Sequence, residues 1–137
     1  MSLRKKYIIV CVISLLSGGA YYLLFKDGTF FEKIICGYAD IIPIKDRIPE
    51  ISSVFFNNHF CDYLWAFSLQ SGLFAIFLPC KKKKMIITVI VVLYGAVWEL
   101  GQRLQIVGGT GDIVDILMYF AGSVTVFFIN ETKETVK

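Results

Sequence analysis

Ionisable and amide side chains occur in pairs, three residues apart, at the ends of three apolar stretches of the sequence. The pairs are His59 with Asp62, Glu99 with Gln102, and Asp112 with Asp115. Residues three apart share one face of a helix, so each pair can present both groups to the same neighbour. Carboxylates gathered in a poorly hydrated place either keep a proton or recruit a cation. The spacing therefore predicts a polar binding site, provided that the apolar stretches bring the pairs together.

The apolar stretches that must position these pairs are long for a water-soluble domain. Hydrophobic residues make up 56% of the 137 positions and charged residues only 18%, whereas soluble domains carry about 25% charged residues. The apolar residues also come in blocks that approach the roughly 20 residues a helix needs to cross a bilayer. We therefore expect an all-α, polytopic membrane helical bundle that forms a single domain over residues 1–137.

Four membrane-spanning helices are predicted over residues 7–25, 59–80, 85–104 and 113–130. The first block could instead be a signal peptide, but the apolar run continues through Phe25, beyond a usual cleavage region, which favours an uncleaved anchor. The lysine run 81–84 is expected to connect the second helix to the third. The glycine-rich segment 107–111 connects the third helix to the fourth, and its glycines permit a tight turn.

Residues 30–42 have apolar side chains at helical spacing but also carry Glu32, Lys33 and Asp40. The segment is too short and too charged to span a bilayer, and Pro43 ends its helical pattern. It is predicted to be a short amphipathic helix on the membrane surface. A helix packed within a loop, without contact with lipid, is an equally good interpretation.

Basic residues indicate the orientation of the chain. Arg4, Lys5 and Lys6 precede the first apolar block, and the run 81–84 lies between the second and the third. Positive charges beside spans favour the cytoplasmic side, so both the N-terminus and the C-terminus are expected in the cytoplasm. A lysine run without aromatic or polar readers between its members does not indicate nucleic-acid binding.

The four cysteines are widely spaced and include no CxxC pair, so they do not indicate a zinc site. Cys36 and Cys61 are both expected near the extracytoplasmic side, and whether they form a disulfide is left open. The alternative is that both are plain small apolar residues.

The alternating directions of the predicted helices bring the three polar pairs to one depth, just below the extracytoplasmic interface. Tyr119 and Gly122 continue the face of the third pair inward, and the small Gly122 would let a neighbouring helix approach closely. Ionisable residues are costly in lipid and normally face the interior of a bundle. The candidate ligand-binding residues are therefore His59, Asp62, Glu99, Gln102, Arg103, Asp112, Asp115 and Tyr119.

Structural roles are open for several of these residues. Asp112 is placed to cap the fourth helix, and capping explains this residue at least as well as ligand binding does. Glu99 and Arg103 are four residues apart and could form a structural ion pair. His59 could simply be an interfacial residue.

Structural roles explain Asp62 and Asp115 least well, because each lies about one turn inside its predicted helix. The candidate site also contains four carboxyl groups but only one residue that is certain to be positively charged, Arg103. The nearby aromatic residues fit an ordinary interfacial belt, namely Tyr63, Trp65 and Trp98.

Three motifs follow one another in the second half of the chain: Trp98-Glu99-x-x-Gln102, then Gly109-Thr110-x-Asp112-x-x-Asp115, then Tyr119-x-x-Gly122. Together with the segment from His59 to Leu64, they resemble the VanZ-like family of small bacterial membrane proteins over residues 55–130. Many members carry an arginine shortly before the aspartate pair, where this chain has its Gly-Gly-Thr-Gly loop, and Tyr119 stands where asparagine is common. The family is named for a protein associated with teicoplanin resistance, so the resemblance implies an envelope-related membrane role and no established catalytic residues.

Three functions follow as hypotheses. The first is a non-enzymatic envelope protein of the bacterial inner (cytoplasmic) membrane, whose acidic and amide cluster binds an amphiphile, a lipid headgroup or a cation. The second is a metal-dependent lipid-modifying enzyme, because clustered carboxylates can hold Mg²⁺, although no nucleophile stands beside a base at a recognisable spacing. The third is an oligomeric channel, transporter subunit or membrane effector. Membrane lipids are the expected partners, and no residue is assigned as a metal ligand.

Overall fold

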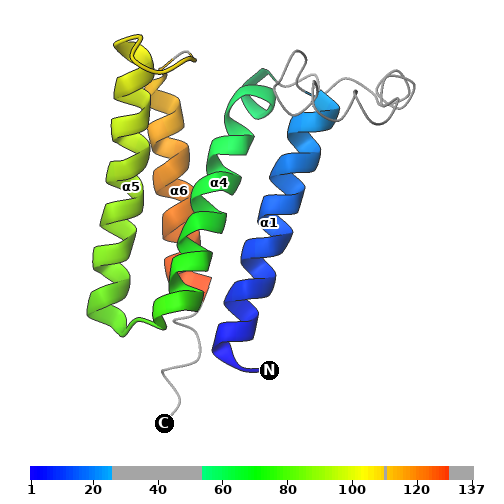
Figure 1. Ribbon diagram of the computed structural model, residues 1–137, viewed down its shortest axis with the longest axis vertical. Helices are drawn as coiled ribbons and strands as arrows, with labels where there is room; N and C mark the ends of the chain where they lie inside the picture. The colour runs from blue at the N-terminus through cyan, green and yellow to red at the C-terminus, as the bar shows by residue number, and fades with distance from the viewer. Residues whose placement is uncertain (26–53, 110, 130–137) are drawn as a thin grey trace.

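The computed structural model describes residues 1–25, 54–109 and 111–129, and the regular structure within these ranges is entirely α-helical. It consists of α1 (Leu3–Phe25), α4 (Val54–Phe77), α5 (Lys81–Arg103) and α6 (Ile113–Ile129) (Figure 1). Three of these helices are long and apolar enough to cross a membrane, and α6 is a shorter apolar helix. The predicted surface helix at 30–42 lies outside the described residues, as does Cys36.

The connection between α4 and α5 differs from the expected one. The helix α4 ends at Phe77, and Leu78 has a left-handed φ of 42°. Pro79 follows, and a proline disfavours helical backbone in the residue before it. The chain re-enters a helix at Lys81, so the lysine run forms the first turn of α5 instead of the link between the helices.

The helix α4 holds the bundle together. It packs along α1 on one side and along α6 on the other, while α5 packs against α6 and, over a smaller area, against α4. Gly122 of α6 lies where the two helices come closest, because a Cβ atom there would be 2.5 Å from the backbone oxygen of Tyr63 and 3.3 Å from Cβ of Ala66. The expected close approach of a neighbouring helix at Gly122 is therefore confirmed.

A buried polar layer connects three helices near the middle of the bundle. Gln70 of α4 is fully buried, and its amide nitrogen donates to Oγ1 of Thr88 on α5 and to the backbone oxygen of Ser123 on α6, each at 2.9 Å. Interhelical hydrogen bonds of this kind fix the register of packed helices.

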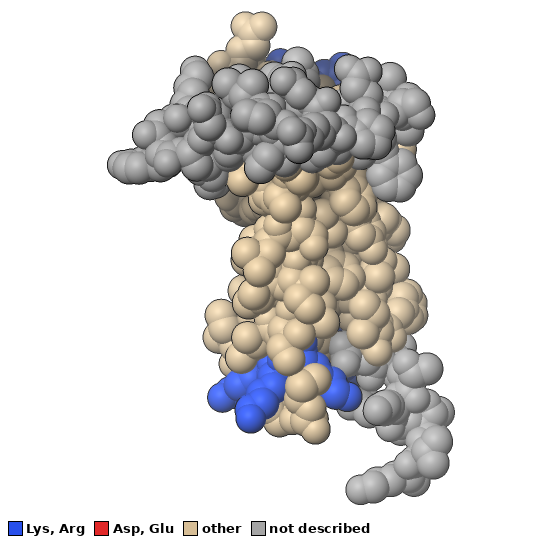
Figure 2. All heavy atoms as spheres, turned by 90° about the vertical axis from the view of Figure 1, so that its right-hand side faces the viewer, with Lys and Arg blue, Asp and Glu red and all other residues tan. Residues whose placement is uncertain are grey.

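The outer surface of the bundle is apolar. Large side chains such as Leu16, Ile76, Val97 and Leu117 are more than half exposed on four different helices. The two basic segments, at the start of α1 and of α5, lie at the end of the bundle that carries the N-terminus (Figure 1). On the face shown in Figure 2, basic side chains gather at that end, below an uncharged middle zone.

Candidate functional site

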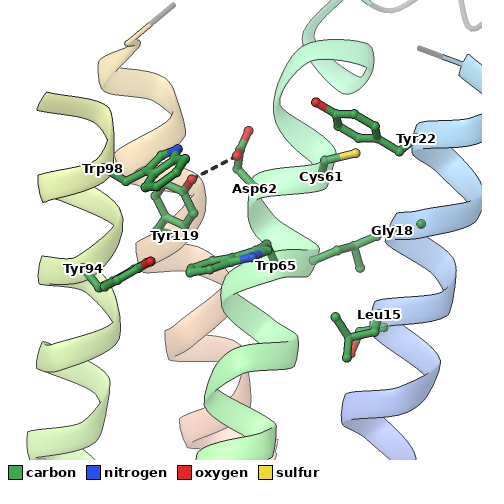
Figure 3. A pocket seen from close by; sticks show the side chains of 12 residues that line it. Leu15, Gly18, Tyr22, Cys61, Asp62, Trp65, Tyr94, Trp98 and Tyr119 are labelled. Atoms are coloured by element: carbon green, nitrogen blue, oxygen red, sulfur yellow. Dashed lines mark hydrogen bonds between the residues drawn. The ribbon is translucent and has the colours of Figure 1, made fainter. Parts of the chain in front are cut away.

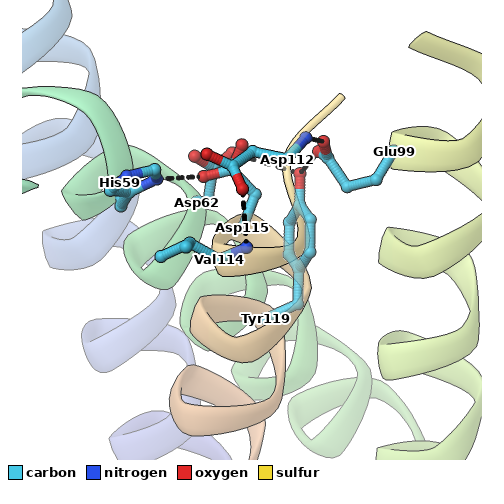
Figure 4. A network of polar contacts seen from close by, with 7 residues as sticks. All are labelled: His59, Asp62, Glu99, Asp112, Val114, Asp115 and Tyr119. Atoms are coloured by element: carbon cyan, nitrogen blue, oxygen red, sulfur yellow. Dashed lines mark hydrogen bonds and ion pairs between the residues drawn. The ribbon is translucent and has the colours of Figure 1, made fainter. Parts of the chain in front are cut away.

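The three polar pairs lie where α4 begins, α5 ends and α6 begins, at the opposite end of the bundle from the two basic segments (Figure 1). Figure 4 shows the polar contacts that form at this end. Asp62 comes from α4, Glu99 from α5 and Asp115 from α6, and hydrogen bonds or close approaches join them through shared neighbours. Because α4 begins at Val54, before its predicted start, His59 and Asp62 lie deeper within their helix than expected. The expected convergence of the pairs at one depth is observed.

Tyr119 is the residue that joins the helices most directly. Its hydroxyl group donates to Oδ1 of Asp62 at 3.1 Å and lies 3.3 Å from Oε1 of Glu99. A hydroxyl carries a single proton, so these two carboxyl groups share one donor. The Tyr119 ring is buried and packs directly over Gly95 of α5, where a Cβ atom would overlap it. Tyr119 thus places two acidic side chains from different helices around one polar atom.

The acidic cluster consists of Asp62, Glu99, Asp112 and Asp115 with their partners His59 and Tyr119. His59 and Asp115 form its second connection. Nδ1 of His59 lies 2.5 Å from Oδ1 of Asp115, and both side chains are largely shielded from solvent. The Phe55 ring packs beside the imidazole with 5.0 Å between ring centroids. Asp115 is also a charged neighbour of Asp62, so the His59–Asp115 pair lies directly against the acid that binds Tyr119.

Glu99 fixes the end of α5 to the start of α6. Its Oε2 atom accepts a hydrogen bond from the backbone nitrogen of Asp112 at 3.1 Å. With its amide nitrogen turned toward Glu99, Gln102 donates to the same oxygen at 3.1 Å and accepts from Nε1 of Trp98 at 3.1 Å. Glu99 is only 4% exposed, and its carboxylate is surrounded by these donors and by Tyr119.

Two of the open structural roles are now decided. Oδ1 of Asp112 accepts a hydrogen bond from the backbone nitrogen of Val114 at 3.0 Å, which is the geometry of a helix cap. The alternative of a Glu99–Arg103 ion pair is wrong within the part of the chain that the structure describes. The Glu99 carboxylate turns inward to its donors, whereas the Arg103 side chain is exposed at the end of α5.

Glycines allow the loop between α5 and α6 to lie this close to the cluster. Gly109 has a φ of 133°, a region that side chains other than glycine rarely adopt. A Cβ atom on Gly111 would overlap backbone atoms of Glu99 and Arg103. The loop therefore delivers the backbone nitrogen of Asp112 to Glu99 only because both positions are glycine.

A groove of about 620 Å³ lies beside the cluster, with walls from α1 and α5 and a floor from α4 (Figure 3). Its lining is mostly apolar and aromatic, and includes Gly19 of α1, Trp65 of α4 and Trp98 of α5. Asp62 and Tyr119 line the same groove at its polar end. Trp65 is held by stacking on Tyr94, with 5.5 Å between ring centroids and 16° between ring planes.

No pattern in the sequence indicated this groove directly. Trp65 and Trp98 fit an ordinary interfacial belt in the sequence, but in the structure both line the groove. The signal that could have drawn attention to them is that the chain has only two tryptophans, and that both lie within four residues of a candidate site acid.

The chain matches no family model, no curated protein and no solved structure. The fold and the site define its class by themselves: an all-helical bundle with a buried acidic cluster at one end and an aromatic groove beside it. Within the described residues, no three acidic, histidine or cysteine side chains are grouped as metal ligands. Binding of Mg²⁺ and the resemblance to the VanZ-like family both stay predictions from the sequence.

Proposed function

We propose that this chain is a multi-pass protein of the bacterial inner membrane, of the VanZ-like kind, that binds an amphiphile at its extracytoplasmic end without modifying it. Three helices of sufficient length and an apolar outer surface support the membrane location. The shorter α6 has 17 residues, or about 26 Å of helix, which is close to the ~30 Å thickness of a hydrocarbon core. Both basic segments lie at the end assigned to the cytoplasm.

One observation carries the proposal: Asp62 belongs to the hydrogen-bonded acidic cluster and also lines the aromatic groove. A molecule in the groove can therefore touch a polar cluster at one end and apolar walls along the rest of its length. Ligand sites are typically concave, largely apolar and equipped with a few polar groups that orient the ligand. A molecule with a polar head and an aliphatic chain matches both parts.

The α1 wall of the groove makes room for such a chain. Gly19 lines the groove, and a Cβ atom built there would meet no heavy atom within 4 Å. A larger side chain at this position would therefore extend into the groove without displacing the protein's own atoms. Ala20, the next residue, is exposed and does not line the groove, which makes it a matched control.

Intrinsic fluorescence provides a direct test, because both tryptophans of the chain line the groove. The purified protein in neutral detergent micelles would be titrated with a neutral amphiphile that carries bromine on its chain. Binding in the groove predicts saturable quenching in the unchanged protein and in Ala20→Leu, and a loss of the saturable part in Gly19→Leu. Quenching that rises linearly in all three proteins would show simple partitioning into the micelle and would refute the proposal.

A further inference from the structure

Among the described residues, the acidic cluster has few basic partners. Of its four described carboxyl groups, Asp115 pairs with His59 and Asp112 caps α6. Asp62 accepts a hydrogen bond from the Tyr119 hydroxyl, and its charged neighbours are the carboxyl groups of Asp115 and Glu99. No arginine or lysine from the described residues forms an ion pair with Asp62, although it faces a groove large enough for a ligand.

Aromatic rings surround the position that faces Asp62. Trp65 lies below it, Trp98 and Tyr119 lie on the α5 and α6 side, and Tyr22 lies on the α1 side (Figure 3). Trp65 also contacts the Tyr119 ring edge to face, with 5.7 Å between centroids and 78° between planes. Faces of tryptophan and tyrosine attract ammonium groups, and aromatic cages of this composition bind quaternary ammonium ligands.

We infer that the groove selects a single-chain amphiphile whose head is a cationic ammonium group. Asp62 lies opposite the ammonium group, and Trp65 and Trp98 line the groove around it. The inference rests on the proposed function and names the class of its ligand. An ammonium group supplies the positive charge that no described lysine or arginine gives to Asp62, and the aliphatic chain occupies the space beside Gly19. A phosphate next to the ammonium would bring negative charge toward Glu99 and Asp115, so the matching head carries net positive charge.

Three probes that share one brominated dodecyl chain test this choice of head group. They carry a trimethylammonium, a neutral maltoside or a sulfate head, and each is titrated into the unchanged protein in maltoside micelles while tryptophan quenching is recorded. The trimethylammonium probe is expected to bind on the order of tenfold more tightly than the neutral probe, the size of a partly desolvated cation–aromatic contact. The sulfate probe is expected to bind most weakly.

Two variants with the same change in charge locate the origin of the preference. Asp62→Asn removes the charge that faces the groove and keeps an oxygen for Tyr119, so the preference for the cationic head should fall to near unity. Asp112→Asn removes one charge from the same end but keeps a capping side chain outside the groove, so the preference should persist. A preference that survives in Asp62→Asn, or disappears in Asp112→Asn, would overturn the role given to Asp62.

The outcomes separate this inference from the proposed function. Equal saturable binding of all three probes, abolished by Gly19→Leu, would overturn the cationic head and leave amphiphile binding intact. Absence of saturable quenching with every probe would overturn both. Because the comparison of heads uses the unchanged protein, it gives its answer even if Asp62→Asn fails to fold.

Discussion

Replacement of Gly122 by alanine should weaken the bundle, although alanine is the better helix former. The added Cβ atom would lie 2.5 Å from the backbone oxygen of Tyr63 and 3.2 Å from the backbone nitrogen of Phe67. Backbone atoms inside a helix cannot rotate away, so α4 and α6 must separate. Overpacking of this kind costs ~1–3 kcal/mol and the helix propensity of alanine offsets ~1 kcal/mol, so we expect a net loss of up to ~2 kcal/mol.

Unfolding of the solubilised protein by sodium dodecyl sulfate, followed by far-ultraviolet circular dichroism, would measure the change in stability. Gly19→Ala is the matched control, because no heavy atom lies within 4 Å of its Cβ position. The control should be neutral or gain up to about 1 kcal/mol. If Gly122→Ala is as stable as Gly19→Ala, α4 and α6 do not approach each other as closely as described. The role given to Gly122 in their packing is then wrong.

Three further changes test separate parts of the structure. Tyr119→Phe keeps the ring over Gly95 but removes the donor shared by two acids, so stability should fall by roughly 1–3 kcal/mol in the same unfolding titration; no change would mean that the hydroxyl group is not their donor. Gln70→Leu removes two interhelical hydrogen bonds, and we expect the unfolding free energy to fall by about 1 kcal/mol. A higher unfolding free energy would show that the buried amide destabilises the bundle. In a variant whose only cysteine is Cys80, which is exposed next to the lysine run, an impermeant maleimide should label inverted vesicles and leave intact cells unlabelled, and the reverse pattern would contradict the proposed orientation.

The helices of the site could be predicted because their apolar blocks are long and their polar residues are regularly spaced. The order of the helices then required that the pair at 99 and 102 and the pair at 112 and 115 share one end. Tyr119 could be included because it lies four residues, about one helical turn, after Asp115. Gly122 could be identified for the same reason, as the next small residue on that face.

The rest depends on how helices distant in sequence pack, which local patterns do not determine. The groove exists because one face of α1 packs on α4 while Gly19 leaves space in the α1 wall, and no spacing within α1 identifies that face. The hydrogen-bond partner of Glu99 could not be predicted either. Arg103, four residues away, is the partner that the sequence suggests, whereas the backbone nitrogen of Asp112 reaches Glu99 only once the loop has folded. The start of α5 was misplaced because four consecutive lysines suggest a connection, although lysine is a good helix former.

The helix α1 packs chiefly against α4, and the groove separates it from α5. A ligand that contacts both walls would connect α1 to α5, in addition to the direct packing of α1 on α4. Binding to the folded form alone raises the unfolding free energy by about 2.7 kcal/mol at a concentration one hundred times the dissociation constant. Removal of such a ligand during purification would therefore leave α1 held chiefly by its packing on α4.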